Sequence, residues 1–252
     1  MAESGQPYRR WQPDGAYDAV VIGSGIGGLG VAALLACRAG KRALVLERHA
    51  TKAGGFTHIF KRKGFEWDVG LHYVGEVHRP DSTIRRLFDE ITGGRLDWQP
   101  MGDVYDTVVV GEERFEYVAG RDSWRQRMHE CFPAEIKAVD RYLDLVTETV
   151  RGARSYFGAK ALPGPAAAVA GPFMRRGFLK HASRTVAEVL DELTDDALLK
   201  TVLTAQYGDY GLTPKHASFG IHAARCVSDA NFETIHATIL WIDRYDATVG
   251  QP

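Results

Sequence analysis

This sequence contains few cysteines, no long apolar run and no marked excess of one charge. Three cysteines occur among 252 residues, far apart and without a C-x-x-C pair, which argues against a disulfide framework or a zinc site. No run of about 20 apolar residues is present, which argues against a membrane-spanning helix. The first residues contain no apolar core of the kind found in signal peptides. We therefore predict a cytoplasmic protein without a metal, and leave association with a membrane surface open.

The charge balance and the composition are those of an ordinary globular protein. The formal net charge is −1, from 31 basic and 32 acidic residues, so no overall positive field attracts nucleic acid. Apolar residues make up 45% and charged residues 25%, as in ordinary globular proteins. We expect Cys37 to fill space in a buried helix.

The segment from residue 17 to residue 47 has the pattern of a β-α-β unit. Residues 17–22 (YDAVVI) and 43–46 (ALVL) are short, apolar and rich in branched side chains, which predicts two buried parallel strands. A helical pattern runs between them from Leu29 to Arg38 and ends at Gly40.

A G-x-G-x-x-G motif lies where the first strand meets the helix. Gly23 would form the tight turn, Gly25 would admit a pyrophosphate, and Gly28 would let the helix lie close to the sheet. Glu47 ends the second strand, 47 − 28 = 19 residues later, where it can accept the hydroxyls of an adenosine ribose. The alternative is a glycine-rich turn that binds nothing. Arg48 should point away from Glu47.

Gly54 and Gly55 follow Glu47 after a short spacer. Here the chain resembles the flavoprotein superfamily of amine oxidases, phytoene desaturases and carotenoid isomerases, in which such a pair approaches FAD. The resemblance implies FAD rather than NAD, and the Glu47 carboxylate disfavours NADP. The predicted cofactor-binding residues are Gly23, Ser24, Gly25, Ile26, Gly27, Gly28, Glu47, Arg48, Gly54 and Gly55.

The following stretch extends the resemblance. Two strands are expected to turn at Lys63-Gly64, and F-x-x-D-x-G-x-H-Y then spans residues 65–73. This pattern resembles the phytoene desaturase-related branch, its retinol saturase-like members in particular, and the resemblance continues weakly to residue 222. It implies that His72 and Tyr73 line a substrate cavity in front of the flavin. The alternative is that they are core or rim residues.

The middle of the chain is predicted to be mostly helical. A β-hairpin is expected over 104–118, and apolar residues at helical spacing from residue 124 to 150 predict a packed helix face broken at Pro133. Residues 161–172 are rich in Ala, Pro and Gly and predict a mobile connection. Residues 173–181 mix apolar and basic side chains. They would contact a membrane or guard an entrance, or simply form a partly exposed helix.

Local signals predict two further helices. Thr185 and Glu188 form a capping box, and Thr194 or Asp195 is expected to cap the next helix. His216 and His222 are six residues apart, which is not the spacing of metal ligands on one helix face.

We therefore divide the chain into an N-terminal extension (1–16), the N-terminal part of a Rossmann-like FAD/NAD(P)-binding domain (17–100), a mostly helical substrate domain with a hairpin (101–226) and an atypical tail (227–252). The expected fold is α/β, with a mixed α+β substrate domain inserted into the nucleotide-binding domain. In the resembled families a later segment completes the flavin site. We expect that part to be missing here, and a sheet edge and an apolar patch to be exposed where it would pack.

The resemblance implies an FAD-dependent oxidoreductase that acts on the C–C bonds of a lipophilic isoprenoid polyene, as a desaturase, saturase or isomerase. One alternative is an amine oxidase-like flavoenzyme, which the basic residues at 61–63 disfavour. Another is a non-catalytic nucleotide-binding remnant. No spacing identifies a catalytic residue, and the oligomeric state is left open.

Overall fold

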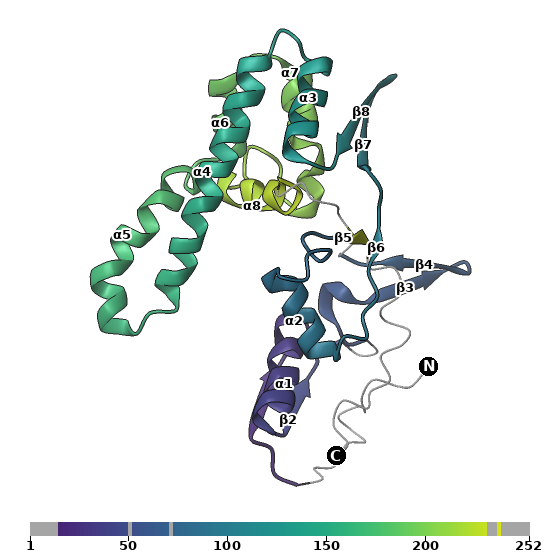
Figure 1. Cartoon of the computed structure of the whole chain (residues 1–252), viewed down its shortest axis with the longest axis vertical. Helices are drawn as coiled ribbons and strands as arrows, with labels where there is room; N and C mark the ends of the chain where they lie inside the picture. Colours follow the sequence, from purple (N-terminus) through teal and green to yellow (C-terminus); the bar gives the residue numbers. More distant parts are fainter. Residues whose placement is uncertain (1–14, 50–51, 71–72, 231–235, 238–252) are drawn as a thin grey trace. The chain divides into compact units, whose positions relative to one another are not determined.

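The structure is a computed structural model that describes residues 15–49, 52–70, 73–230 and 236–237 (Figure 1). The chain divides into two compact units, each described by itself. Unit 1 comprises Met1–Pro100 with His236–Pro252, and unit 2 comprises Met101–Ile235. In the described part of the chain, no helix has the length and apolar character needed to cross a membrane.

Unit 1 contains the predicted β-α-β unit. Strands β1 (Ala19–Ile22) and β2 (Ala43–Leu46) pair in parallel, with Ala19 opposite Ala43. Helix α1 (Ile26–Ala39) connects them and ends at Gly40, whose φ of 60° provides the left-handed C-cap that favours glycine. The β-α-β prediction is confirmed.

The prediction that both strands are buried is wrong. Val21 points toward α1, whereas Val20 is 58% exposed and Ile22 is 87% exposed. Alternate side chains of a strand point to opposite faces, and α1 covers one face only among the described residues. The expected exposed apolar surface is therefore present at this sheet. Cys37 is also exposed on α1, not buried as predicted.

Short strands follow in unit 1. Strands β3 (Ile59–Arg62) and β4 (Phe65–Asp68) form an antiparallel hairpin that turns at Lys63-Gly64, as predicted. Strand β9 (His236–Ala237) pairs with both β5 (Tyr73–Val74) and β6 (Gln99–Pro100).

Helix α2 (Thr83–Thr92) completes unit 1. The Ser82 hydroxyl caps it by accepting a hydrogen bond from the Arg85 N–H. A small core of Ala33, Val77, Phe88, Ile91 and Leu96 joins α2 to α1.

Unit 2 begins with the predicted hairpin of β7 (Val104–Val110) and β8 (Glu113–Val118). Helices α3 (Arg121–Cys131) and α4 (Ile136–Lys160) follow on either side of Pro133. Of the eight residues of the predicted packed face, Ile136 is exposed and Val150 is half-buried. The other six are buried: Trp124, Met128, Phe132, Val139, Leu143 and Val146.

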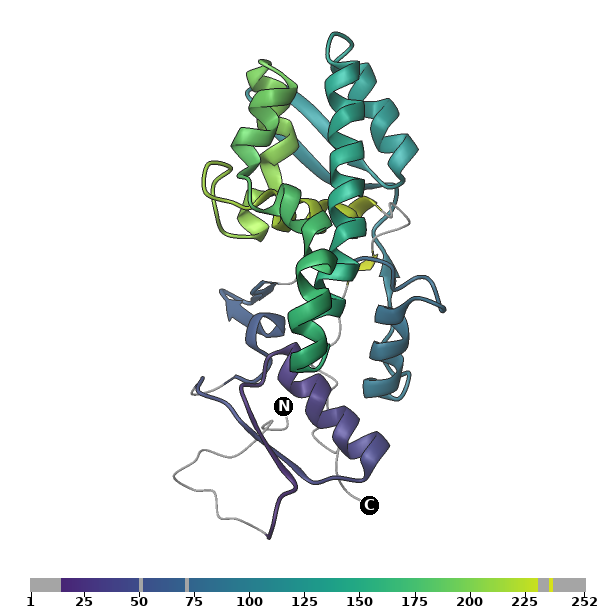
Figure 2. The ribbon, with the colours of Figure 1, turned by 90° about the vertical axis from the view of Figure 1, so that its left-hand side faces the viewer.

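The predicted mobile connection at 161–172 is wrong, because most of it belongs to helix α5 (Gly164–Ala182). Pro165 lies in the first helical turn, where its missing N–H costs little, and the alanines favour a helix. Close packing on α4 adds support: a Cβ at Gly152 would lie 2.7 Å from the Phe178 nitrogen. Helices α4 and α5 run side by side as a helical hairpin (Figure 1), and they overlap in the view turned by 90° (Figure 2).

The remaining elements are α6 (Val186–Leu193), α7 (Ala197–Thr204), the 3-10 helix η2 (Ala205–Asp209) and α8 (Phe219–Ala230). The capping box that opens α6 is confirmed. The expected cap of α7 is wrong: Asp196 is the cap, because its carboxylate accepts from the N–H groups of Leu198 and Leu199.

Candidate functional site: the nucleotide-binding loop of unit 1

The three motif glycines occupy the turn between β1 and α1. Gly23 has a φ of 98°, and a Cβ at Gly28 would lie 2.1 Å from the Gly23 carbonyl oxygen, so only glycine lets α1 approach the strand here. A Cβ at Gly25 would meet nothing within 4 Å, which leaves open space at the helix start.

Gly25 is the N-cap of α1 and has no side chain to accept from the first turn. The first N–H groups of a helix have no intrahelical acceptor, and the positive end of the helix dipole lies at the same point. Ile26 and Gly27 belong to this turn. Together these groups make the loop suited to an anion such as a pyrophosphate.

Glu47 is exposed and anchored to the glycine loop. Its Oε2 accepts from the Ser24 backbone N–H (2.9 Å) and from the Ser24 hydroxyl, and its Oε1 accepts from the His49 N–H (2.7 Å). A carboxylate offers about four lone-pair positions, so acceptor capacity remains for hydroxyl groups of a ligand.

These hydrogen bonds set the charge of Glu47. The Ser24 hydroxyl, followed by the backbone N–H groups of His49 and Ser24, lowers the pKa of Glu47 to about 2. The side chain is therefore an anion, and an acceptor only, throughout the neutral range.

Gly54 and Gly55 lie directly beside Gly25. Gly54 forms an isolated parallel bridge with Gly25, and its N–H donates to the Ser24 hydroxyl (3.0 Å). A Cβ at Gly55 would lie 3.0 Å from the Gly25 Cα, and both glycines have positive φ values (114° and 57°). The backbone thus closes around the loop in a way that side chains would block.

Ser24 is the residue whose role the sequence did not predict. It is 1% exposed, and its hydroxyl accepts from Gly54 while donating to Glu47, so one side chain joins three separate segments. The only sequence signal was its position as the second residue of the motif.

The other predicted site residues are less involved. The Arg48 side chain is exposed, and its backbone N–H adds to the lowering of the Glu47 pKa. Tyr73 is half-buried and its β5 position faces Ala237 in the strand pairing. His72 lies outside the described residues.

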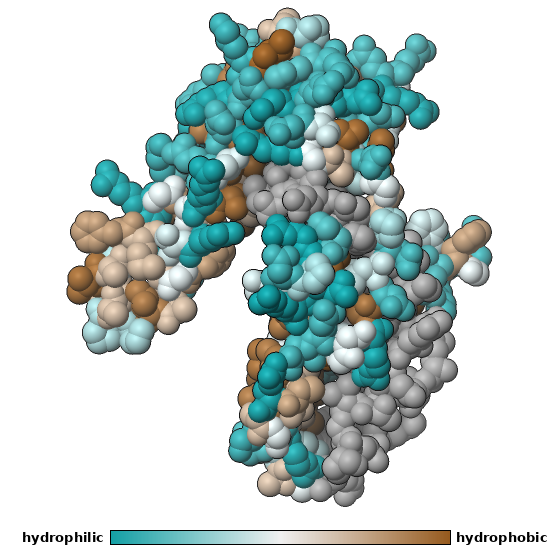
Figure 3. Space-filling view, viewed as in Figure 1, coloured by the Kyte–Doolittle hydropathy of each residue, from teal (hydrophilic) through white to brown (hydrophobic). Residues whose placement is uncertain are grey.

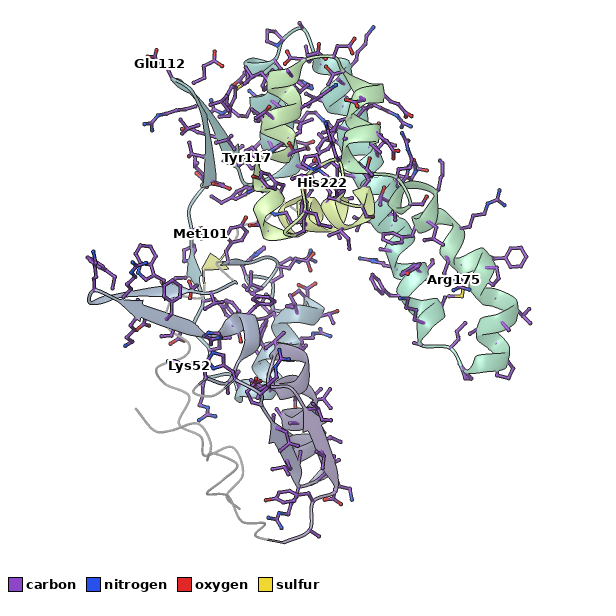
Figure 4. The ribbon with its side chains drawn as sticks, turned by 180° about the vertical axis from the view of Figure 1, so that it is seen from behind. Lys52, Met101, Glu112, Tyr117, Arg175 and His222 are labelled. Atoms are coloured by element: carbon purple, nitrogen blue, oxygen red, sulfur yellow. The ribbon has the colours of Figure 1, made fainter. Side chains whose placement is uncertain are left out.

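Unit 2 contains a separate cavity of about 30 Å³, room for one or two water molecules, whose lining includes several polar side chains. His222, labelled on α8 in Figure 4, is one of the residues that line it. Its Nε2 lies 2.8 Å from the Tyr142 hydroxyl and its Nδ1 lies 3.1 Å from the Tyr210 hydroxyl. The Cys226 sulfur lies 3.2 Å from the same Tyr142 hydroxyl.

The pKa values of the two tyrosines and of Cys226 shift in opposite directions. Burial raises the pKa of Tyr142 well above its ordinary value and the pKa of Tyr210 to about 12. Burial alone would raise the pKa of Cys226, but the His222 imidazole and the hydrogen bonds from His222 and Tyr142 lower it. The sequence did not predict this cluster, because its members come from α4, from the end of η2 and from α8, and follow no motif.

The described residues contain no group of three or more His, Cys, Asp or Glu side chains that could hold a metal ion.

Comparison with known proteins identifies relatives of this chain. Over residues 21–91 the chain matches the family model described as an NAD(P)-binding Rossmann-like domain. All-trans-retinol 13,14-reductase of Danio rerio is 42% identical over 219 residues, which covers 82% of this chain and 35% of the relative. The chain is homologous to the all-trans-retinol 13,14-reductases. The predicted resemblance to the phytoene desaturase, carotenoid isomerase and retinol saturase-like family is therefore confirmed.

Two further relatives show how much of the chain is matched in each case. A Danio rerio protein named inactive all-trans-retinol 13,14-reductase is 35% identical over 217 residues, 82% of this chain and 35% of the relative. Prolycopene isomerase 1, chloroplastic, of an Oncidium hybrid cultivar is 56% identical over 54 residues, 21% of this chain and 9% of the relative. The chain thus spans about a third of the length of the retinol reductases that it matches.

The solved structure of putrescine oxidase bound to putrescine shares the fold. It matches with a TM-score of 0.52 at 19% identity, covering 88% of this chain and 45% of that chain. At this identity the match supports the predicted Rossmann-like α/β architecture and nothing more specific.

Proposed function

We propose that this chain carries the FAD-binding part of an oxidoreductase that acts on C–C bonds of an isoprenoid polyene. The observation that carries the cofactor assignment is the network in which Ser24 joins Glu47 to Gly54. The names of the retinol- and carotenoid-acting relatives support the substrate class.

Each part of the loop would contact a different part of the dinucleotide. The N–H groups that follow Gly25 would bind the pyrophosphate, and the Glu47 carboxylate would accept the hydroxyls of the adenosine ribose. Gly54 and Gly55 would leave room for the flavin side of the cofactor, and Arg48 would lie at the rim. When bound, FAD supplies the hydride chemistry, while the protein binds and orients it and excludes water.

The finer assignments follow from the same proposal. Residues 101–226 would form the substrate domain, and His72 and Tyr73 would line the cavity for a lipophilic polyene. Such a substrate partitions into lipid, so contact of the protein with a membrane would shorten its path to the site.

A second function deserves a test because one relative of similar coverage is named inactive. In that case the chain would bind the nucleotide without turnover. FAD binding combined with the absence of any spectral change in retinol or a carotenoid under anaerobic reducing conditions would favour this alternative.

The cofactor assignment is tested by titrating the purified chain with FAD, NAD⁺ and NADP⁺. We expect FAD to bind most tightly, and Glu47→Gln to weaken it about tenfold or more, since a hydrogen bond to a charged group contributes about 1.5–3 kcal/mol. Glu66→Gln on β4 removes the same charge from unit 1 outside the loop and should leave the Kd unchanged. Preferential binding of NADP⁺, or equal loss in both variants, would contradict the assignment.

A further inference from the structure

The α4–α5 hairpin of unit 2 ends in an exposed apolar surface. Phe157 near the end of α4 is 61% exposed, and Val169 and Phe173 on α5 are 74% and 79% exposed. In the space-filling view, brown and tan residues gather over α5, whereas teal residues dominate the helices at the opposite end of the same unit (Figure 3). A concentrated apolar patch of this kind marks an interaction surface.

This surface is not the side of α5 that packs inside the hairpin. The inner side is already filled by Gly171, Phe178 and His181, which are all buried. The hairpin also packs tightly, because Gly152 of α4 lies against the backbone of Gly177 and Phe178. Val169 and Phe173 therefore have no role in holding the two helices together.

The charges around the patch have a single sign. Every charged residue between Glu148 and Glu188 in the sequence is basic, although the whole chain has slightly more acidic than basic residues. Arg151, Arg154 and Arg176 are exposed, and none forms an ion pair with another described residue.

The packing of α4 on α5 orders these groups along the hairpin. Gly152 lies against Phe178 and Gly158 lies against Met174, so the helices run in opposite directions from the connection between them. The apolar residues thus lie nearer the end of the hairpin, and the arginines lie behind them. Lys180, farther back, is held by Glu148 at 2.8 Å.

We propose that the end of the α4–α5 hairpin docks on an anionic lipid bilayer. Phe157, Val169 and Phe173 would enter the boundary between headgroups and acyl chains, and the arginines behind them would face the anionic headgroups. An anionic bilayer matches both the apolar end and the basic rim. Docking at this depth requires no spanning helix, and it does not depend on the proposed redox function.

The proposal is tested by co-sedimentation of the full chain with phosphatidylcholine vesicles, with and without about 30% phosphatidylserine. We expect binding at least about tenfold stronger to the anionic vesicles, and weaker binding as salt is raised, because surface charges are screened.

Substitutions identify the surface. Val169→Asp combined with Phe173→Asp should reduce binding to anionic vesicles about tenfold or more, since the apolar contact is lost. Arg151→Gln, Arg154→Gln and Arg176→Gln should each reduce it about fivefold and together remove the preference for phosphatidylserine. Ile221→Asp is the matched control, because Ile221 lies on α8 of the same unit and is 54% exposed. It should bind like the unmodified chain.

Several outcomes would overturn the proposal. These are equal binding of both vesicle types, undiminished binding of the aspartate double variant, or an equal loss in Ile221→Asp. The patch would instead cover a second copy of the chain if the unmodified protein self-associates without vesicles and the double variant does not. All these side chains are exposed, so matching far-UV circular dichroism spectra confirm that the variants are folded.

Discussion

The loop of unit 1 and the cavity of unit 2 are both polar networks, but they are held together differently. In the loop, Glu47 is exposed and accepts from two backbone N–H groups and the Ser24 hydroxyl, and the glycines beside Ser24 shape the backbone. In the cavity, the side chains of Tyr142, Tyr210, His222 and Cys226 bond one another, and Tyr142 and His222 at the middle of this network are buried. The first network therefore depends on backbone conformation, and the second on the cost of leaving buried groups without partners.

The largest expected effect tests the backbone side of this comparison. Gly28→Ala places a Cβ 2.1 Å from the Gly23 carbonyl oxygen, so α1 must move away from β1. We expect a loss of about 3 kcal/mol in local stability, seen as roughly 100-fold faster amide hydrogen exchange over residues 19–46.

Gly30→Ala is the matched control, because a Cβ there meets nothing within 4 Å and alanine favours a helix by about 1 kcal/mol. Equal exchange rates in the two variants would show that the close approach at Gly28 is unimportant.

A smaller effect tests the side-chain network. Tyr142→Phe removes the hydroxyl that contacts both His222 and Cys226, and should cost about 1–3 kcal/mol because buried partners are left unsatisfied. Urea unfolding followed by circular dichroism measures this loss. Tyr156→Phe on α4 changes a half-buried tyrosine outside the cluster and should cost less than about 0.5 kcal/mol. A smaller loss in Tyr142→Phe than in Tyr156→Phe would refute the network.

The pH dependence of Glu47 tests whether its hydrogen bonds hold the loop in place. Its folded pKa of about 2 lies below the ordinary value of 4.5, so its contribution to loop order is fully present above pH 4.5 and is lost as the pH falls toward 2. A carboxyl NMR titration checks this. Ser24→Ala should raise the pKa of Glu47 and leave Glu148, whose pKa is also about 2 because of Lys180 and His181, unchanged. An unshifted Glu47 titration in that variant would contradict the assigned cause.

The smallest expected difference between the two regions is in the rate at which their cysteine thiols are labelled. Cys37 is exposed on α1, whereas the Cys226 sulfur is enclosed by Tyr142 and His222. We expect a maleimide to modify Cys37 at least about tenfold faster in the folded protein, since access limits Cys226. Peptide mass mapping at short times measures both rates, and faster labelling of Cys226 would show that its cavity opens readily.

The sequence predicted the backbone-built network far better than the side-chain cluster. Glycines at fixed spacing, two apolar strands and an acid after the second strand define the loop locally, so the β-α-β unit and the convergence of Glu47 with the motif could be anticipated. The Ser24 bridge could not, because many residue types are compatible with its position in the motif.

The predictions that proved wrong concern segments whose structure is set by tertiary packing. Proline and glycine in residues 161–172 suggested a break, but most of this segment is continuous with the rest of α5, which packs on α4 where Gly152 meets Phe178. The strand pattern at Val20 and Ile22 predicted burial, which also requires a layer over that face of the sheet. The Tyr142–His222 contact joins residues 80 positions apart, and no local pattern reports such a pair.

We propose above that the loop around Ser24, Glu47 and Gly54 binds FAD. The most direct measurement is the absorbance spectrum of the purified chain, followed by identification of any cofactor released on denaturation. We predict flavin bands, either directly or after addition of FAD, and strongly reduced bands in Glu47→Gln. A folded protein that remains colourless and takes up no added FAD would contradict it.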